Sequence, residues 1–184
     1  MSGPRTPLLI DCDTGIDDAL ALLYVCASTE AEVVGVSCVA GNVELPSVVR
    51  NTLAVLELAG RGDLEVASGR EAPIARPLRT AGDTHGPTGL GYAQLPEPTA
   101  GPGPRDAAQL LIDRAYARPG EITLVTLGPL SNVAVALERD PQLPRLFRRL
   151  VMMVGSYRVP GNTAPTMEWN AGVDPEALQA TIEG

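Results

Sequence analysis

The stretch LLIDCDTGIDDALALL, residues 8–23, joins a dense apolar run to four aspartates and then to a second apolar segment. The run at 7–13 is short and stops at charge, which is typical of a buried strand. Residues 17–29 carry apolar side chains at helical spacing, and two acids open the first turn, where the helix dipole favours negative charge. The sequence therefore predicts a strand, a tight turn and a helix. Four acids gather around that turn: Asp11, Asp13, Asp17 and Asp18.

The alternation of strand-like and helix-like segments continues along the chain. Strand patterns lie at 32–41, 64–69 and 121–128. Helix patterns lie at 45–60, at 105–120 with Asp106 as the cap, at 129–140 and at 174–184, and a short helix runs into a strand at 143–155. This order predicts an α/β fold, a mainly parallel open sheet flanked by helices in a Rossmann-like arrangement. Residues 70–105 are rich in Pro and Gly and lack periodicity, which is typical of a functional loop or a linker.

Length and composition narrow the class of protein. A chain of 184 residues fits a single α/β domain spanning 1–184. The net charge of −8 argues against binding to nucleic acid or to a membrane surface. No apolar run reaches the roughly 20 residues that span a bilayer, and the first residues lack a secretory pattern, so we expect a cytoplasmic protein. The three cysteines, Cys12, Cys26 and Cys38, lie in apolar stretches and are expected to be reduced and buried.

The aspartates follow the first strand, and polar or small residues follow two others. Asn42 comes after the strand at 32–41, and Gly128 ends the strand at 121–128. Ligands of parallel sheets bind beyond the carboxyl ends of the strands. Clustered carboxylates repel one another unless a cation offsets them, and their hard oxygens suit Ca²⁺ or Mg²⁺. The alternative is that Asp17 and Asp18 cap a helix while Asp11 and Asp13 are solvated.

Three motifs compete for the aspartate cluster. An EF-hand is excluded, because its fifth position would be Gly15 and no suitable acid follows. The D-x-D-x-T pattern of haloacid-dehalogenase-type phosphatases is close to DCDTG, but the fifth residue is again glycine, and Asp17 and Asp18 have no role in it.

The third motif agrees best with the sequence. DCDTGIDDALAL resembles the D-x-D-P-G-x-D-D-A signature of the nucleoside hydrolase family. Other stretches similar to that family follow in order along nearly the whole chain: VAGN (39–42), HGPTGLG (85–91), TLVTLGPLSNVAVAL (123–137) and NTAPTMEWNAGVDPEA (162–177). The resemblance implies hydrolysis of the N-glycosidic bond of a ribonucleoside to ribose and free base, with Ca²⁺ as cofactor. It also implies a homo-oligomer, a dimer or tetramer.

The resemblance also implies roles for individual residues. Asp13 matches the catalytic base, which is also a Ca²⁺ ligand. Asp18 matches a second ligand, and Leu127 matches a ligand through its main-chain carbonyl. Asp11 looks like an acid that orients the metal site. The remaining matches concern the substrate: Asp17, Asn42, His85, Asn162, Glu168 and Asn170.

The sequence departs from the family pattern at several points. Thr14 stands where proline is usual, and MVGS at 153–156 leaves open whether Met153 or Val154 faces the pocket. Trp169 is expected either beside the ribose or in the core. A further acidic ligand and a histidine of some members lie farther downstream in the family, so we expect a shortened chain. Two alternatives therefore stay open, a metal-dependent phosphatase and a catalytically silent fragment. The sequence does not fix the preferred base.

Overall fold

A computed structural model of the chain describes residues 4–184. Within them lies a five-stranded sheet in the order β3-β2-β1-β4-β5, and every neighbouring pair is parallel. The strands are β1 (Thr6–Cys12), β2 (Ala31–Cys38), β3 (Val66–Ser68), β4 (Thr123–Thr126) and β5 (Arg149–Met152). The predicted α/β fold with a parallel open sheet is confirmed, and each predicted strand is present.

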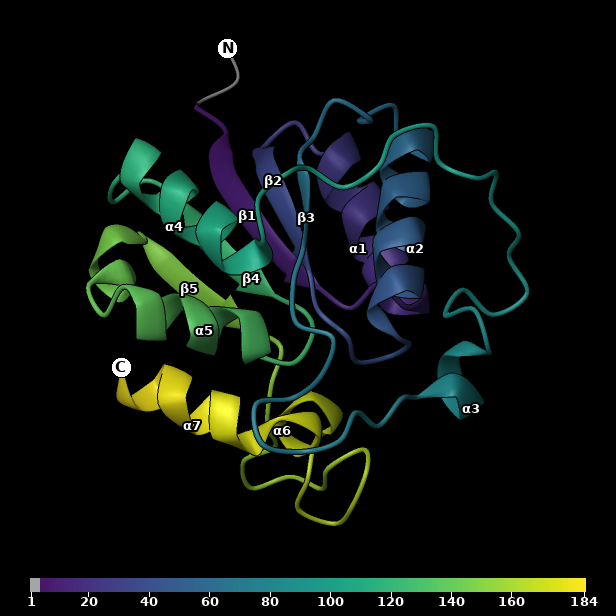
Figure 1. Cartoon of the computed structure of the whole chain (residues 1–184), viewed down its shortest axis with the longest axis vertical. Coiled ribbons are helices and arrows are strands. Elements are labelled where there is room, and N and C mark those ends of the chain that lie inside the picture. Colours follow the sequence, from purple (N-terminus) through teal and green to yellow (C-terminus); the bar gives the residue numbers. More distant parts are fainter. Residues whose placement is uncertain (1–3) are drawn as a thin grey trace.

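Helices cover both faces of the sheet. They are α1 (Ile16–Ala27), α2 (Leu45–Leu58), α3 (Gly82–His85), α4 (Ala107–Ala117), α5 (Ser131–Arg139), the 3₁₀ helix η1 (Leu143–Leu146), α6 (Trp169–Val173) and α7 (Pro175–Glu183). In Figure 1, α4 and α5 lie on one side of β1 and β2, and α1 and α2 lie on the other. Two apolar clusters correspond to these layers. One contains Ile10 and Val36 with side chains of α1 and α2, and the other contains Leu9 and Leu124 with side chains of α4 and α5.

Aspartates cap the start of two helices, and the sequence predicts the first of these caps, Asp106. The Asp106 carboxylate accepts a hydrogen bond from the Gln109 amide (2.8 Å) at the start of α4. The Asp174 carboxylate accepts one from the Ala177 amide (3.0 Å) at the start of α7, whose first residue is Pro175. These contacts satisfy amides that a helix N-terminus leaves without partners. The local sequence therefore sets where these helices begin.

The strand order places β1 at a reversal in the direction of chain progression. The chain moves outward from β1 through β2 to β3, then returns across the sheet to β4 on the other side of β1. Crevices for ligands form at the carboxyl ends of strands at such a point. Asp13, Asn42 and Leu127 follow β1, β2 and β4, so they meet at this edge.

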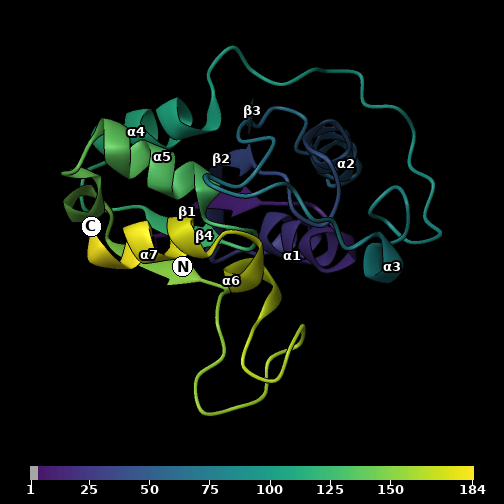
Figure 2. The ribbon, with the colours of Figure 1, turned by 60° about the horizontal axis from the view of Figure 1, so that its bottom comes forward.

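Two long segments leave the layered body, as Figure 2 shows for residues 86–105 and 153–168. The sequence did not predict α3 and α6, which adjoin these segments. Each is one to one and a half turns long and held by tertiary contacts. The Ala81 amide at the start of α3 donates to the Asn42 carbonyl (2.9 Å), and Glu168 caps α6. Such short helices have no periodic pattern to detect.

Cysteine burial agrees with the prediction at two of three positions. Cys12 and Cys38 are free and buried, whereas Cys26 is free but only half-buried on α1.

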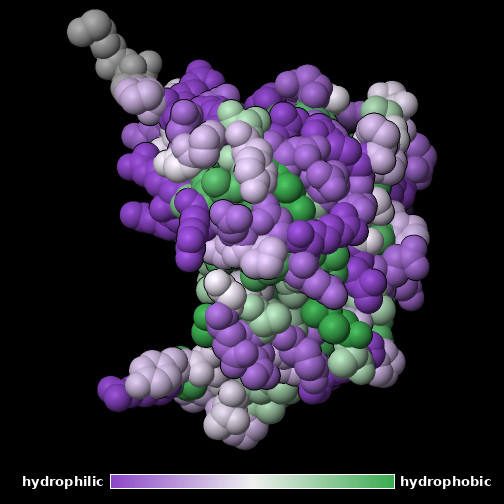
Figure 3. Space-filling model, turned by 60° about the vertical axis from the view of Figure 1, so that its left-hand side comes forward, coloured by the Kyte–Doolittle hydropathy of each residue, from purple (hydrophilic) through white to green (hydrophobic). Residues whose placement is uncertain are grey.

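On the face drawn in Figure 3, hydrophobic residues reach the surface between hydrophilic ones. Exposed large apolar side chains include Val151 on the edge strand β5 and Ile182 on α7. None of the helices in residues 4–184 has the length and apolar character of a membrane span.

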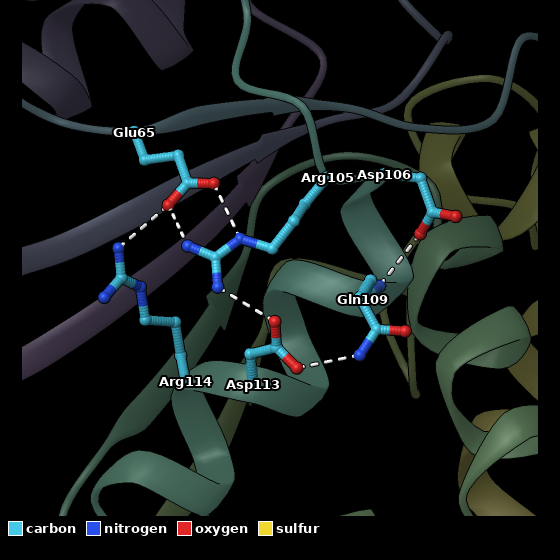
Figure 4. A network of polar contacts seen from close by, with 6 residues as sticks. All are labelled: Glu65, Arg105, Asp106, Gln109, Asp113 and Arg114. Atoms are coloured by element: carbon cyan, nitrogen blue, oxygen red, sulfur yellow. Dashed lines mark hydrogen bonds and ion pairs between the residues drawn. The ribbon is translucent and has the colours of Figure 1, made fainter.

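A network of charged groups fastens the end of the long loop to α4 (Figure 4). The Glu65 carboxylate, just before β3, accepts hydrogen bonds from Arg105 (2.8 Å) and Arg114 (3.0 Å). Arg105 also donates to Asp113 (2.8 Å), and Gln109 donates to the other oxygen of Asp113 (2.7 Å). The Glu65 side chain is 18% exposed, so water screens these contacts less than it screens pairs at the open surface.

Replacing Glu65 with glutamine should therefore destabilise the chain. Two guanidinium groups would lose their shared carboxylate, which we expect to lower the free energy of unfolding by about 1–2 kcal/mol. Urea denaturation monitored by circular dichroism measures the change. The matched control is Glu97→Gln, since Glu97 forms a similar forked pair with Arg50 but is 76% exposed. Equal destabilisation by both variants would contradict the role of the network.

Candidate active site

A cavity of about 190 Å³ opens at the carboxyl edge of the sheet, where the strand order reverses. Its walls come from the ends of β1, β2 and β4, from α3 and from the segment 153–170. The lining residues are Asp13, Asp17, Asn42, Ala81, Thr84, His85, Leu127, Met153, Asn162, Thr163, Glu168, Trp169 and Asn170. Of the ten residues to which the sequence analysis gave a role in the site, Asp11 and Asp18 are missing from the lining.

Asp13 lies at the inner end of the cavity and is 1% exposed. One carboxylate oxygen, Oδ2, accepts a hydrogen bond from the Asn42 amide (2.8 Å). Two glycines leave room for this carboxylate. A Cβ on Gly41 would lie 2.1 Å from Oδ2, and a Cβ on Gly128 would lie 2.9 Å from Oδ1. The ends of β2 and β4 therefore enclose Asp13 by close backbone approach, which explains the glycine after each strand.

Asp18 lies close to Asp13 but faces away from the open cavity. It is 3% exposed, and its Oδ2 accepts hydrogen bonds from the Gly15 amide (2.9 Å) and from the Asn42 side chain (3.2 Å). Asn42 therefore contacts both acids, one through its backbone and one through its side chain. No hydrogen-bond donor within residues 4–184 reaches the other oxygen of Asp18, Oδ1, which is buried.

Asp11 is fully buried one layer farther from the cavity. Its Oδ1 accepts hydrogen bonds from Ser37 Oγ (2.5 Å) and from Asn132 Nδ2 (2.8 Å), while its Oδ2 has no partner among the described residues. The Asn132 amide also donates to the Cys38 carbonyl (2.9 Å), which ties α5 to β2. The sequence analysis did not single out Ser37 or Asn132, although Asn132 lies within the family-like stretch 123–137.

Burial raises the pKa of all three acids. It raises the pKa of Asp11 to about 7 and that of Asp18 to about 6, and in Asp18 the neighbouring Asp17 adds to the rise. The pKa of Asp13 is raised by burial first and by repulsion from Asp18 second. Hydrogen bonds from Asn42 to Asp13 and to Asp18 act in the opposite direction without cancelling the shift. The surroundings of these three carboxylates therefore disfavour their ionised forms.

The carbonyl of Leu127 is held at the cavity wall by a buried amide. Asn170 Nδ2 donates to the Leu127 carbonyl (2.7 Å) and to the Met153 carbonyl (2.9 Å). This contact joins the end of β4 to α6. Met153 lines the cavity, whereas Val154 packs against the apolar cluster of α4 and α5, so the structure decides which of the two faces the pocket.

His85 forms a side wall and is neutral in this arrangement. Its Nδ1 accepts a hydrogen bond from the Ile16 amide (3.2 Å), which requires that this nitrogen carry no proton. The contact of 3.8 Å between Nδ1 and Asp17 Oδ1 is therefore not an ion pair. The Asp17 side chain is 59% exposed and lies at the mouth of the cavity.

The segment before α6 supplies the opposite wall. Asn162 Oδ1 accepts a hydrogen bond from the Trp169 amide (2.8 Å). The Glu168 carboxylate accepts from the amides of Gly155 (2.9 Å), Asn170 (2.9 Å) and Ala171 (3.1 Å), so it caps α6 while lining the cavity. Both side chains are thus fixed by backbone donors rather than loose in solvent.

The sequence analysis did not single out some residues of the site and left the environment of others undecided. Trp169 lines the cavity, which decides between its two expected environments. Thr84 and Thr163 also line it, and each is adjacent in sequence to a predicted residue. The unusual Thr14 is fully buried, and its hydroxyl shares a hydrogen bond with Thr52 Oγ1 of α2 (2.6 Å). A proline there could not make this contact, so threonine has a local structural reason.

The donor set agrees in part with a hard divalent cation. In residues 4–184, no three His, Cys, Asp or Glu side chains converge as a ready metal site. However, Asp13 and Asp18 are buried like charges, Asp18 Oδ1 has no partner there, and the Leu127 carbonyl lies on the same wall. These groups would provide part of the 6–8 oxygens that Ca²⁺ takes. A cation would also favour the charged forms of both acids, which burial and, to a lesser extent, like-charge repulsion disfavour.

A Rossmann-like sheet with buried acids at its switch point defines a broad class of α/β enzymes, and sequence comparison narrows it. The family model described as inosine-uridine preferring nucleoside hydrolase matches residues 8–184. The chain therefore belongs to the nucleoside hydrolase family. This result decides between the two enzyme families that the DCDTG motif resembles.

Relatives and solved structures agree with this assignment. A probable uridine nucleosidase 2 of Arabidopsis thaliana is 40% identical over 177 residues, which are 95% of this chain and 55% of the relative. A pyrimidine-specific ribonucleoside hydrolase RihA of Citrobacter koseri is 39% identical, over 96% of this chain and 56% of the relative.

Among solved structures, a plant nucleoside hydrolase superposes with a TM-score of 0.90 at 38% identity, covering 96% of this chain and 56% of that one. A purine-preferring ribonucleoside hydrolase from Gardnerella vaginalis gives a TM-score of 0.92 at 29% identity, covering 95% and 57%. The chain spans a little over half the length of these relatives.

The raised pKa values predict how stability depends on pH without metal. Asp18 titrates at about 6 in the folded chain and near 3.8 in an unfolded one. Between these values the folded chain binds more protons, so the free energy of unfolding should fall as pH rises. Asp18→Asn should flatten this slope. Urea denaturation in chelator at several pH values measures it.

Asp83→Asn is the control for that slope, because Asp83 is an exposed acid on α3. It should leave the slope between about pH 4 and about pH 6 as in the parent chain, since the substitution leaves the buried acids in place. A slope unchanged in Asp18→Asn would show that burial of Asp18 does not oppose its charge.

Proposed function

We propose that this chain forms the ribose-binding and water-activating part of a Ca²⁺-dependent nucleoside hydrolase, which cleaves ribonucleosides to ribose and free base. The observation that carries the proposal is the enclosed carboxylate of Asp13 at the inner end of a polar cavity at the switch point. Membership of the family supports it. Uridine is the first substrate to test, because relatives at 38–41% identity include uridine nucleosidases and pyrimidine-specific hydrolases.

Asp13 acts as the general base in the proposed reaction. It removes a proton from a water molecule, and the water oxygen forms a bond to C1′ of the ribose. The N-glycosidic bond breaks, and the nucleobase departs with the bonding electron pair and takes up a proton. The transition state resembles an oxocarbenium ion, so neighbouring negative charge stabilises it. The neutral His85 is a wall of the pocket in this proposal and not the general acid.

Asp13, Asp18 and the Leu127 carbonyl are the groups that would hold Ca²⁺. When bound, the ion supplies positive charge that keeps the carboxylates ionised, lowers the pKa of water and fixes the ribose diol. Asp11, which Ser37 and Asn132 hold in place, is assigned the role of orienting the metal site that the family resemblance implies.

The ribose is held by polar groups from three parts of the chain. Asp17 accepts a hydrogen bond from a ribose hydroxyl, and the Asn42 amide contacts the same side of the sugar. Asn162, Glu168 and Asn170 hold the remaining hydroxyl groups and the 5′ end. Their backbone contacts fix them before substrate arrives, which lowers the entropy cost of orienting it.

The family resemblance extends the proposal to the whole protein. It would be a homo-oligomeric, cytoplasmic enzyme of nucleoside salvage with no nucleic-acid or membrane partner. The net charge of −8 is in keeping with the last point.

The role of Asp13 as general base can be tested by measuring hydrolytic activity. Asp13→Asn keeps the shape and loses the proton acceptor, so release of reducing sugar from uridine should fall at least about 100-fold. Glu97→Gln, at an exposed residue that does not line the cavity, should retain the parent rate. Activity that survives in Asp13→Asn would refute the assignment.

The same assay tests whether the chain by itself is catalytically active. A silent fragment would release no sugar at any Ca²⁺ concentration.

The metal assignment has a readout that does not need turnover. Calcium should raise the melting temperature of the parent chain, because a ligand that binds only the folded state stabilises it by mass action. Asp18→Asn should abolish most of this rise, while Asp83→Asn should keep it. Differential scanning fluorimetry with calcium and chelator measures the shift. Equal shifts in all three proteins would place the cation elsewhere.

A further inference from the structure

A second cavity continues outward from the candidate active site. It has a volume of about 520 Å³ and shares Thr84, Asn162, Thr163 and Trp169 with the first cavity. We call it the outer cavity. Its additional wall comes from residues 79–83, in and just before α3. The outer cavity therefore lies against the loop to which the proposed function assigns the 5′ end of the ribose.

Arg79 gives the outer cavity a fixed cation. Its guanidinium carbon lies 5.1 Å from the centroid of the Trp169 ring, so the side chain stacks on the indole. Among residues 4–184 no carboxylate lies within ion-pair distance of Arg79. No other Arg or Lys among the described residues lines either cavity. Its donors are thus available to an anion at this point.

The rest of the wall is also rich in donors. Thr80, Thr84 and Thr163 contribute hydroxyl groups. One acid, Asp83, lies on the same wall and opposes an anion. The single cation and the three hydroxyl groups match a group with several acceptor oxygens, such as a phosphate.

We infer that the outer cavity holds the phosphate of a nucleoside 5′-monophosphate, with Arg79 as its main contact, while the ribose occupies the inner cavity. The inference rests on the proposed function and extends its substrate class from nucleosides to nucleotides. In the reaction, the C1′–N bond breaks, water supplies the new C1′–O bond, and the base leaves with the electron pair. The products are ribose 5-phosphate and the protonated free base.

Trp169 provides a direct measurement, because it is the only tryptophan in the chain and lines both cavities. Its fluorescence can be titrated with uridine and with uridine 5′-monophosphate in the presence of calcium. The ratio of the two dissociation constants isolates the contribution of the phosphate. Arg79→Gln should reduce the preference for the monophosphate about tenfold, the effect of one lost charge-assisted contact.

Three further variants sharpen the result. Arg79→Lys keeps the charge and should lose only part of the preference, and Asp83→Asn should increase it. Arg158→Gln is the matched control, since Arg158 stacks on Tyr157 at 5.0 Å and lines neither cavity. It should leave the ratio unchanged. Added salt should weaken binding of the monophosphate more than binding of uridine.

The outcomes separate this inference from the proposed function. If uridine binds but the ratio is the same in the parent chain and in Arg79→Gln, the phosphate site is refuted and the proposed function stands. If neither uridine nor ribose perturbs Trp169, the proposed function fails as well. An effect of Arg79→Gln on orotidine, which carries its carboxylate on the base, but not on the monophosphate would assign the cation to the base and overturn the inference.

Discussion

The burial of like charges at the carboxyl end of β1 is the constraint on which the rest of this site depends. Asp11, Asp13 and Asp18 are almost free of solvent, and desolvation opposes their charged forms. Such an arrangement persists only where the surrounding structure supplies donors, and here Asn42 contacts two of the acids. The remaining unpartnered oxygens are a cost that a bound cation would offset.

The topology of the sheet explains why the donors converge. β1 has neighbours on both sides, so groups that follow β1, β2 and β4 meet at one edge although they come from segments that are far apart in the sequence. Gly41 and Gly128 let the two flanking backbones approach Asp13 closely. The later segment before α6 then closes the wall by hydrogen bonds from Asn170 to backbone carbonyls. Acid, amide and carbonyl groups are thereby fixed before any ligand enters.

The two connected cavities differ in charge. Acids lie at the inner end, where a cation and a sugar diol are proposed, and Arg79 lies on the outer wall. Trp169 belongs to both, so a ligand that fills the two would contact one face or edge of the same ring. This division allows one site to favour opposite charges at the two ends of a substrate.

The sequence by itself determined the order and type of the long elements, the parallel sheet and the side of it on which the acids lie. Those features follow from local periodicity and capping, as at Asp106 and Pro175. Only the tertiary structure decided the rest. It revealed α3 and α6, the choice of Met153 over Val154, the recessed position of Asp18 behind Asn42 and the stacking of Arg79 on Trp169. Each of these depends on contacts between residues distant in the chain, for which no local pattern exists.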